Sequence, residues 1–196
     1  MQRICENTQI CYAVLRGKSN LYIWGNEIQK KKMLDAAKKS QEEMQVQILA
    51  YCVLNNEMHL LVLASQEETE EFIDKTKKCY LELIAEVYQI KKSVIFRKDI
   101  IKILNGAEAA ERYSIKLHLL PVDYGIVMQA KDYWWCSYSD YMGRKWIGLA
   151  DVDWLLCQYD QKRNRAVSIM RKKHLDYMQK RTCSNSGRKY TEKMIQ

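Results

Sequence analysis

Two apolar runs separated by two asparagines constrain this chain more than any other feature of its sequence. Residues 44–54 (MQVQILAYCVL) and 57–64 (EMHLLVLA) are rich in strand-forming side chains, and each has the length of a strand. Asn55 and Asn56 lie between them, and asparagine tolerates the positive φ angles of a tight two-residue turn. We therefore expect an antiparallel β-hairpin around which the rest of the domain is arranged.

The segments on either side of this hairpin have the pattern of two further strands and two helices. Residues 9–16 and 94–97 are short runs of strand formers. Residues 26–40 and about 67–89 repeat their apolar residues at helical spacing. The resulting order, β-α-β-β-α-β, is that of a split βαβ unit. We therefore predict an α/β (α+β) fold, a ferredoxin-like antiparallel sheet with helices on one face.

A third helix is expected to follow the sheet. Asn105 can cap a helix that begins at Ala107. This helix is expected to end at Leu120, because Pro121 biases the residue before it away from the helical region.

The C-terminal part of the chain is predicted to be an extension rather than a second full domain. Residues 133–143 are aromatic and loop-like, helical signals return over 152–180, and the last sixteen residues have a composition typical of a frayed end. We therefore expect one domain at 1–150 and a basic, mostly helical extension at 151–196.

The positive charge of the protein is concentrated in that extension. The whole chain carries a formal net charge of +8. Residues 161–196 hold eleven Lys or Arg against Asp176 and Glu192, a local balance of +9, so residues 1–160 carry about one net negative charge. Such a basic block favours a polyanionic partner, although a solvated tail has the same composition.

The cysteines indicate a reducing compartment, and the apolar runs indicate a protein that is neither exported nor embedded in a membrane. The seven cysteines are odd in number and never spaced as C-x-x-C, so neither a disulfide framework nor a zinc site is expected. Residues 1–17 have no continuous apolar run, so we expect no export signal, and no later run reaches the about 18 apolar residues that a membrane span needs. We expect a cytoplasmic protein with no membrane partner.

Three ordered stretches of the sequence resemble one protein family. They are 50–62 (AYCVLNNEMHLLV), 117–127 (LHLLPVDYGIV) and 133–143 (YWWCSYSDYMG). In order and spacing they resemble the metal-binding strand, the helix end and the aromatic segment of HUH-type single-tyrosine transposases, of the REP-associated tyrosine transposase kind. Weaker similarity elsewhere extends the resemblance over most of the chain.

The family motif implies a metal-dependent reaction on single-stranded DNA. Residues i and i+2 of a strand point to one face, so its two histidines present two nitrogens to one divalent cation. A tyrosine and an amide at i and i+4 share one face of the facing helix. The metal polarises a phosphodiester, and the tyrosine attacks it to form a covalent phosphotyrosine.

This sequence departs from the family motif at three of its four positions. Glu57 occupies the first histidine position, His59 keeps the second, Lys116 falls on the tyrosine and Leu120 on the amide. Glu57 can still ligate Mg²⁺ or Mn²⁺, because hard cations accept carboxylate oxygen. Together with His59 it supplies only two ligands, so any such ion is expected to bind weakly. Lys116 is protonated and cannot form a phosphotyrosine, although it can hold a phosphate.

A different tyrosine is a candidate substitute for the missing nucleophile. Tyr113 lies one turn before Lys116, but about 4.5 Å of helix rise separates the two. The metal and the phosphate would have to move as well, so loss of cleavage is the better expectation. Whether the protein is an enzyme is left open by the sequence. His118 also lies at a family position, and we expect it to be structural, satisfying a nearby backbone group.

Candidate contacts to nucleic acid are basic or aromatic. They comprise two isolated arginines, two adjacent tryptophans that can stack on unpaired bases, and basic residues of the extension: Arg16, Arg97, Trp134, Trp135, Arg163, Arg165, Arg171, Lys172 and Lys173.

The sequence therefore supports three functional hypotheses. The leading one is a transposase-like protein that binds single-stranded or hairpin DNA and is impaired or inactive in cleavage and strand transfer. The second is an active transposase with a site remodelled around Glu57, His59 and Tyr113. The third is an RNA-binding or protein-interaction module that kept only the fold. The resemblance allows a homodimer as well as a monomer.

Overall fold

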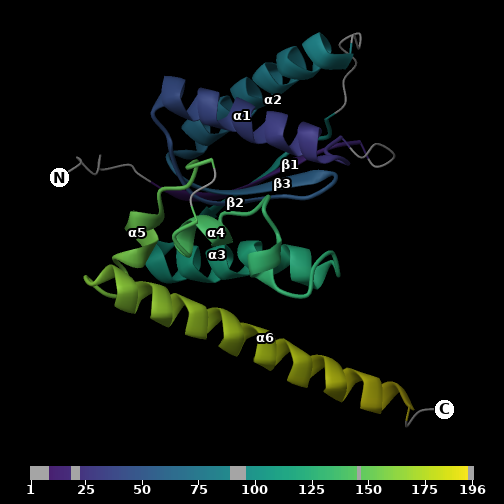
Figure 1. The fold of residues 1–196 in the computed structure, drawn as a ribbon, viewed down its shortest axis with the longest axis vertical. Helices are drawn as coiled ribbons and strands as arrows, with labels where there is room; N and C mark the ends of the chain where they lie inside the picture. Colours follow the sequence, from purple (N-terminus) through teal and green to yellow (C-terminus); the bar gives the residue numbers. More distant parts are fainter. Residues whose placement is uncertain (1–8, 19–22, 89–95, 145–146, 194–196) are drawn as a thin grey trace. The chain divides into compact units, whose positions relative to one another are not determined.

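The computed structural model describes residues 9–18, 23–88, 96–144 and 147–193. Their contacts divide the chain into two compact units, Met1–Leu155 and Leu156–Gln196, which we describe separately. The first unit holds the sheet, and the second holds one long helix (Figure 1).

The described part of the first unit contains a four-stranded antiparallel sheet. Its strands are β1 (Ile10–Arg16), β2 (Gln47–Val53), β3 (Glu57–Leu63) and β4 (Ile100–Leu104), in the spatial order β2-β3-β1-β4. Helix α1 (Glu27–Met44) connects β1 to β2, and helix α2 (Gln66–Tyr88) connects β3 to β4. Each helix thus links two strands that are separated by a third, so the predicted ferredoxin-like topology is confirmed.

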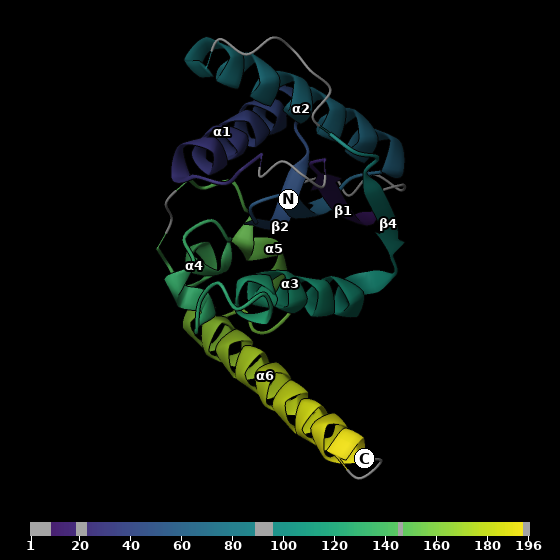
Figure 2. The ribbon, with the colours of Figure 1, turned by 90° about the vertical axis from the view of Figure 1, so that its right-hand side faces the viewer.

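The helices of this unit cover both faces of the sheet. Helices α1 and α2 lie together on one face, and α3 (Gly106–Asp123) lies on the other (Figures 1 and 2). Alternation along β1 shows the same division, because the ring of Tyr12 packs against Tyr113 of α3, whereas its fully buried neighbours Cys11 and Ala13 point the opposite way.

The expectation that the helices share one face is therefore corrected: it holds for α1 and α2 but not for α3. The reason can be read in the strands. β2 and β3 bury nearly every residue, as strands do when helices cover both faces of their sheet.

Two predicted boundaries are also wrong. The fourth strand is β4 at 100–104 rather than 94–97; of the predicted range, residues 94–95 lie outside the described residues, and Phe96 makes only an isolated bridge to Gly17. Helix α3 continues past Pro121, and Asn105 makes no side-chain cap. Pro121 removes one N–H donor from the last turn, and its carbonyl accepts hydrogen bonds from the Ile126 and Val127 amides.

The aromatic segment attaches to the outer edge of β2. Cys136 forms an antiparallel bridge with Cys52, in which Val53 N donates to Trp135 O at 2.8 Å and Ser137 N to Tyr51 O at 3.0 Å. A 3-10 turn (η1, Ala130–Asp132) precedes the bridge and a short helix, α4 (Tyr138–Tyr141), follows it. The segment is therefore partly ordered into regular structure, which its loop-like composition did not indicate.

Beyond α4 the chain is helical again. Helix α5 (Val152–Leu156) ends the first unit, and α6 (Arg163–Lys193) forms most of the second. The backbone of α6 continues into the residues expected to fray. No described helix is both long and apolar enough to cross a lipid bilayer.

Candidate DNA-binding site

The two remaining candidate metal ligands lie side by side on β3. Glu57 and His59 are two residues apart, so both side chains project from the sheet face that α3 covers. Glu57 Oε2 lies 3.2 Å from His59 Nε2, close enough for an ion pair, although Nε2 is not aligned for a hydrogen bond. His59 lowers the pKa of Glu57, and the nearby Arg16 and Arg97 lower it further, so this carboxylate is held in its charged form.

A third residue, Tyr12 of β1, completes this cluster. Its hydroxyl lies 2.7 Å from His59 Nδ1. Because the ionised Glu57 favours a proton on Nε2, Nδ1 is the acceptor and Tyr12 the donor. Burial is the main cause that raises the pKa of Tyr12 to about 12, and the charge of Glu57 adds to it. Tyr12 therefore stays a neutral phenol at physiological pH.

The predicted nucleophile positions on α3 lie next to this cluster. The ring of Tyr113 packs on Tyr12 with a centroid separation of 4.9 Å. Lys116 Nζ lies 5.2 Å from the centroid of the Tyr113 ring, and Lys102 Nζ of β4 lies 5.6 Å from it. The phenol that touches His59 is thus Tyr12, whereas Tyr113 contacts Tyr12 and has both lysine ammoniums near its ring.

The donors present do not fit a complete divalent metal site. Glu57 and His59 supply two ligands, and Leu120, at the position of the family amide, has none to offer. Both nitrogens of His59 already face a partner. Within the described ranges, no group of three or more His, Cys, Asp or Glu is arranged to hold a metal ion. Glu57 and His59 therefore offer a hard cation at most two of the roughly six donors that it takes.

The two candidate arginines of the first unit lie close to Glu57. Arg16 is the register partner of Glu57 across β1 and β3, and its guanidinium donates to Lys98 O through Nε at 3.2 Å and Nη2 at 2.7 Å. The Arg97 amide donates to Arg16 O at 2.8 Å. The structure thus gathers both arginines beside the Glu57–His59 pair, which their wide separation in sequence did not indicate.

The two candidate tryptophans differ in exposure. Trp134 is 55% exposed, whereas Trp135 is 8% exposed. Base stacking needs an accessible ring face. Trp134 therefore has a ring accessible for stacking, whereas Trp135 is packed in the interior, the alternative expected of an aromatic cluster.

His118 is buried in a hydrogen-bonded network. Its Nε2 lies 2.9 Å from Ser137 Oγ, and that oxygen also bonds the Tyr51 amide at 2.9 Å and the Tyr51 carbonyl at 3.2 Å. The burial of His118 and its contact with the Ser137 hydroxyl agree with the structural role expected for it. This network joins α3, β2 and the aromatic segment.

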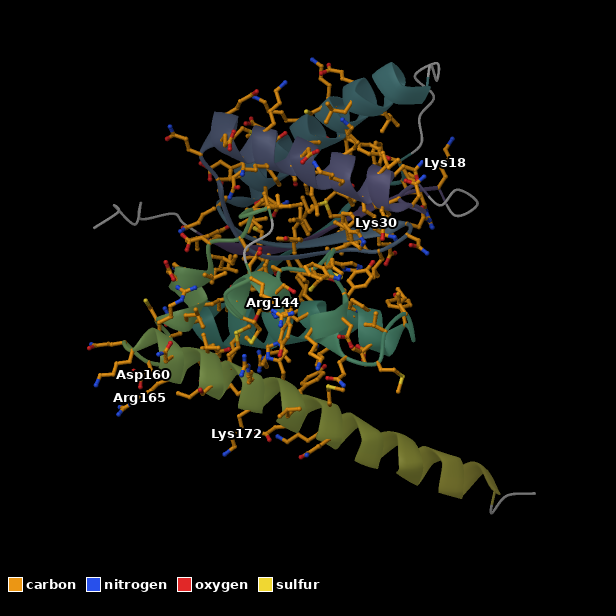
Figure 3. All side chains as sticks on the ribbon, viewed as in Figure 1. Lys18, Lys30, Arg144, Asp160, Arg165 and Lys172 are labelled. Atoms are coloured by element: carbon orange, nitrogen blue, oxygen red, sulfur yellow. The ribbon has the colours of Figure 1, made fainter. Side chains whose placement is uncertain are left out.

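The candidate residues of the extension lie on α6. Four of them are exposed on this helix: Arg163, Arg165, Arg171 and Lys172. Figure 3 shows Arg165 and Lys172 extending from it. The fifth, Lys173, is half-buried, with its ammonium 5.2 Å from the centroid of the Tyr159 ring. Among the five, Lys173 is therefore the least accessible to a ligand.

Sequence reasoning missed two residues of the site. Tyr12 and Lys102 are adjacent across β1 and β4, but nothing in their local sequence marks them. A correct pairing of β1 with both β3 and β4 would have placed them beside His59 and Tyr113.

Comparison with known proteins agrees with the architecture. No protein-family model matches this sequence, and no curated protein matches it. Among solved structures, the fold is similar to a REP-associated tyrosine transposase bound to a REP hairpin, with a TM-score of 0.58 and 16% identity over 79% of this chain and 88% of that one. The chain therefore has the fold of a single-tyrosine, HUH-type transposase.

Two further solved structures have lower TM-scores. A protein described as a transposase of Deinococcus radiodurans gives 0.44 at 12% identity, over 58% of this chain and 92% of that one. A bacterial tRNA(His) guanylyltransferase-like protein in complex with GTP gives 0.43 at 12% identity, over 64% and 71%. Neither similarity is high enough to bear on function.

Proposed function

We propose that this protein binds single-stranded or hairpin DNA and is impaired or inactive in the cleavage and strand transfer of single-tyrosine transposases. One observation carries the proposal: the chain has the fold of a transposase that was solved with a DNA hairpin, while basic and aromatic side chains surround the place where that family breaks DNA. Binding needs only these charges and rings, whereas cleavage needs a nucleophile and a metal.

Loss of cleavage follows from the chemistry of the side chains. An ammonium at position 116 cannot form the phosphotyrosine that conserves the energy of the broken phosphodiester bond. Leu120 cannot complete a metal shell. Of the two remaining ligands, His59 already faces both Glu57 and Tyr12.

The same contacts count against the remodelled-site hypothesis as the sequence framed it. A nucleophile that is activated by a side-chain base has to lie within hydrogen-bond reach of that base. If His59 acted as the base, it would face Tyr12 rather than Tyr113. Tyr12 is itself a poor nucleophile here, because burial raises its pKa to about 12.

We propose that any Mg²⁺ or Mn²⁺ binds weakly. Hard cations take about six donors, so water would have to fill most of the coordination shell around Glu57 and His59. Calorimetric titration with Mn²⁺ should give no affinity tighter than about the micromolar range, and Glu57→Gln should abolish the residual binding. Sub-micromolar binding would mean that further ligands move into place.

Competition binding tests the proposed function. A labelled DNA hairpin with a single-stranded extension is bound, then displaced by unlabelled hairpin, by random duplex and by the RNA version of the hairpin. We expect the DNA hairpin to compete at least about tenfold better than duplex, because stacking and shape add to the shared phosphate attraction. Equal competition by duplex would contradict the proposal, and stronger competition by RNA would favour an RNA-binding module.

A further inference from the structure

Two lysines from different elements converge on one tyrosine ring beside the His59 cluster. Lys102 lies on β4 and Lys116 on α3, and both ammonium groups lie within 6 Å of the centroid of the Tyr113 ring. Their elements are adjacent in sequence, but the end of β4, Asn105 and nearly three turns of α3 separate the residues. It is the fold that brings the two charges together.

Among the described residues, neither lysine has an ion-pair partner. Both side chains are exposed, and in the parts of the chain that the structure describes no carboxylate lies within 4.0 Å of either ammonium. The clearest contrast is Lys77 of α2, which pairs with both Asp74 and Asp99. Two unpaired like charges that share one ring raise the local positive potential, which an anion would relieve.

The tyrosine ring that both lysines approach gives the site its geometry. Each ammonium is attracted to the negative face of the ring, a cation–π contact worth about 0.5–1 kcal/mol when exposed. Tyr113 is in turn held by Tyr12, which is fixed by its hydrogen bond to His59. Part of the entropy that two flexible lysines lose on binding is therefore lost before a ligand arrives.

An exposed tyrosine lies close to this site. Tyr124, which follows the end of α3, is 62% exposed, and its phenol is near enough to Tyr12 to contribute to the raised pKa of Tyr12. A strand of DNA presents a phosphate and a neighbouring base together. An exposed aromatic ring next to two lysines therefore fits that ligand better than it fits free phosphate.

We propose that Lys102 and Lys116 form a phosphate clamp that holds one phosphodiester of bound single-stranded DNA beside Tyr113. The clamp rests on the proposed DNA-binding function and assigns it a contact point. In this arrangement Lys116 holds a phosphate at the position where the family motif carries its nucleophile, and Lys102 supplies the second charge from the sheet edge. Tyr113 is a positioning residue that orients both ammoniums.

Neutralising single phosphates tests the clamp. A series of hairpins carries one uncharged methylphosphonate each, at successive positions of the single-stranded extension. For the wild-type protein we expect one position at which affinity falls roughly fivefold, the size of one partly exposed ion pair. Lys102→Gln and Lys116→Gln should each lower affinity for the unmodified hairpin by a similar factor. For these variants, the methylphosphonate at that position should cause no further loss of affinity.

A matched variant separates the clamp from general charge. Lys78 is exposed on α2, on the opposite face of the sheet, so Lys78→Gln removes the same charge away from the site. This variant should keep the full methylphosphonate penalty. Thermal melting of all three variants checks that they fold alike, as expected for substitutions of exposed side chains.

The outcomes distinguish the clamp from the function on which it rests. Suppose that the wild type prefers the hairpin, but Lys102→Gln and Lys116→Gln lose as much affinity as the wild type at every methylphosphonate position. The clamp is then wrong and hairpin binding stands. If hairpin preference is absent but one position is coupled to both lysines, the clamp stands and the hairpin proposal falls. A protein that binds none of these DNAs contradicts both.

Discussion

The polar clusters around His118 and His59 both lie at α3, yet their side chains are used differently. His118 and Ser137 are fully buried, and the Ser137 hydroxyl contacts both the imidazole and the backbone of β2. His59 has one nitrogen without an aligned hydrogen bond and lies near exposed lysines, across Tyr12 and Tyr113. Complete hydrogen bonding indicates a structural role, and unpaired charge indicates a ligand.

The two clusters also differ in how closely they match the transposase motif. His118 and the aromatic segment, residues 133–143, resemble the family motif. In the structure, hydrogen bonds from this segment attach it to β2 at the sheet edge. Tyr141 donates to Leu49 O at 2.6 Å, and Tyr133 donates to Val53 O at 2.7 Å. Glu57, Lys116 and Leu120 depart from the pattern, and all three lie where the cleavage chemistry would occur. The comparison teaches that the residues that hold the scaffold match the family motif, whereas those at the proposed site depart from it.

The largest expected effect is on stability. His118→Ala removes a buried hydrogen bond and leaves a cavity between Tyr138 and Tyr141, whose rings meet the imidazole edge-on, so we expect a loss of about 3 kcal/mol in the free energy of unfolding. His59→Ala should cost less, about 1 kcal/mol, because it removes one hydrogen bond, to Tyr12, and its other neighbour Glu57 is partly exposed to water. Urea denaturation of both variants measures the difference. Equal losses would remove the distinction between a structural and a ligand-binding cluster.

The next effect concerns the extension. Deleting residues 181–196 removes Arg181, Arg188, Lys189 and Lys193. Each lost phosphate contact should reduce the slope of log affinity against log salt by about one, so the slope should flatten by up to about four units. Hairpin preference should change little, because it depends on shape and stacking.

A charge-neutral control sharpens this measurement. Replacing the same four residues by glutamine in the full chain separates charge from length, and should flatten the slope as much as the deletion does. A slope that neither variant changes would mean that this part of the extension does not touch DNA.

The smallest effect is a pH dependence at Glu57. The pKa of this carboxyl is lower in the folded protein than its ordinary value, chiefly through His59 and then through Arg16 and Arg97. Its contribution to stability is therefore present above about pH 4.5 and is lost as the pH falls through the lowered pKa. Melting temperatures from pH 6 to pH 3 should show the gap between wild type and Glu57→Gln closing on acidification. A gap that widens would contradict the ion pair.

Most of the fold could be predicted from local patterns, but the site could not. The hairpin, the β-α-β-β-α-β order and the helix periods are short-range signals, and they gave the correct topology. The placement of α3 was missed because the fully buried strands β2 and β3 were not used as a sign of a sheet covered on both faces.

The site depends on contacts between residues far apart in sequence. Tyr12 and His59 meet only once β1 and β3 pair, and Lys102 reaches Tyr113 only through the register of β4. The burial of Trp135 beside the exposed Trp134 is a tertiary effect of the bridge at Cys136, which two adjacent and chemically identical residues could not reveal.

The central claim, that DNA binding persists without cleavage, is tested by a single incubation. Wild-type protein is mixed with a labelled hairpin that carries a single-stranded extension, with Mn²⁺ or with chelator, and each sample is run on a native and on a denaturing gel. We predict a shifted complex on the native gel and only intact, protein-free DNA on the denaturing gel, with and without metal. A DNA-linked protein band that requires Mn²⁺ and disappears in Tyr113→Phe would contradict the account and establish a remodelled, active transposase.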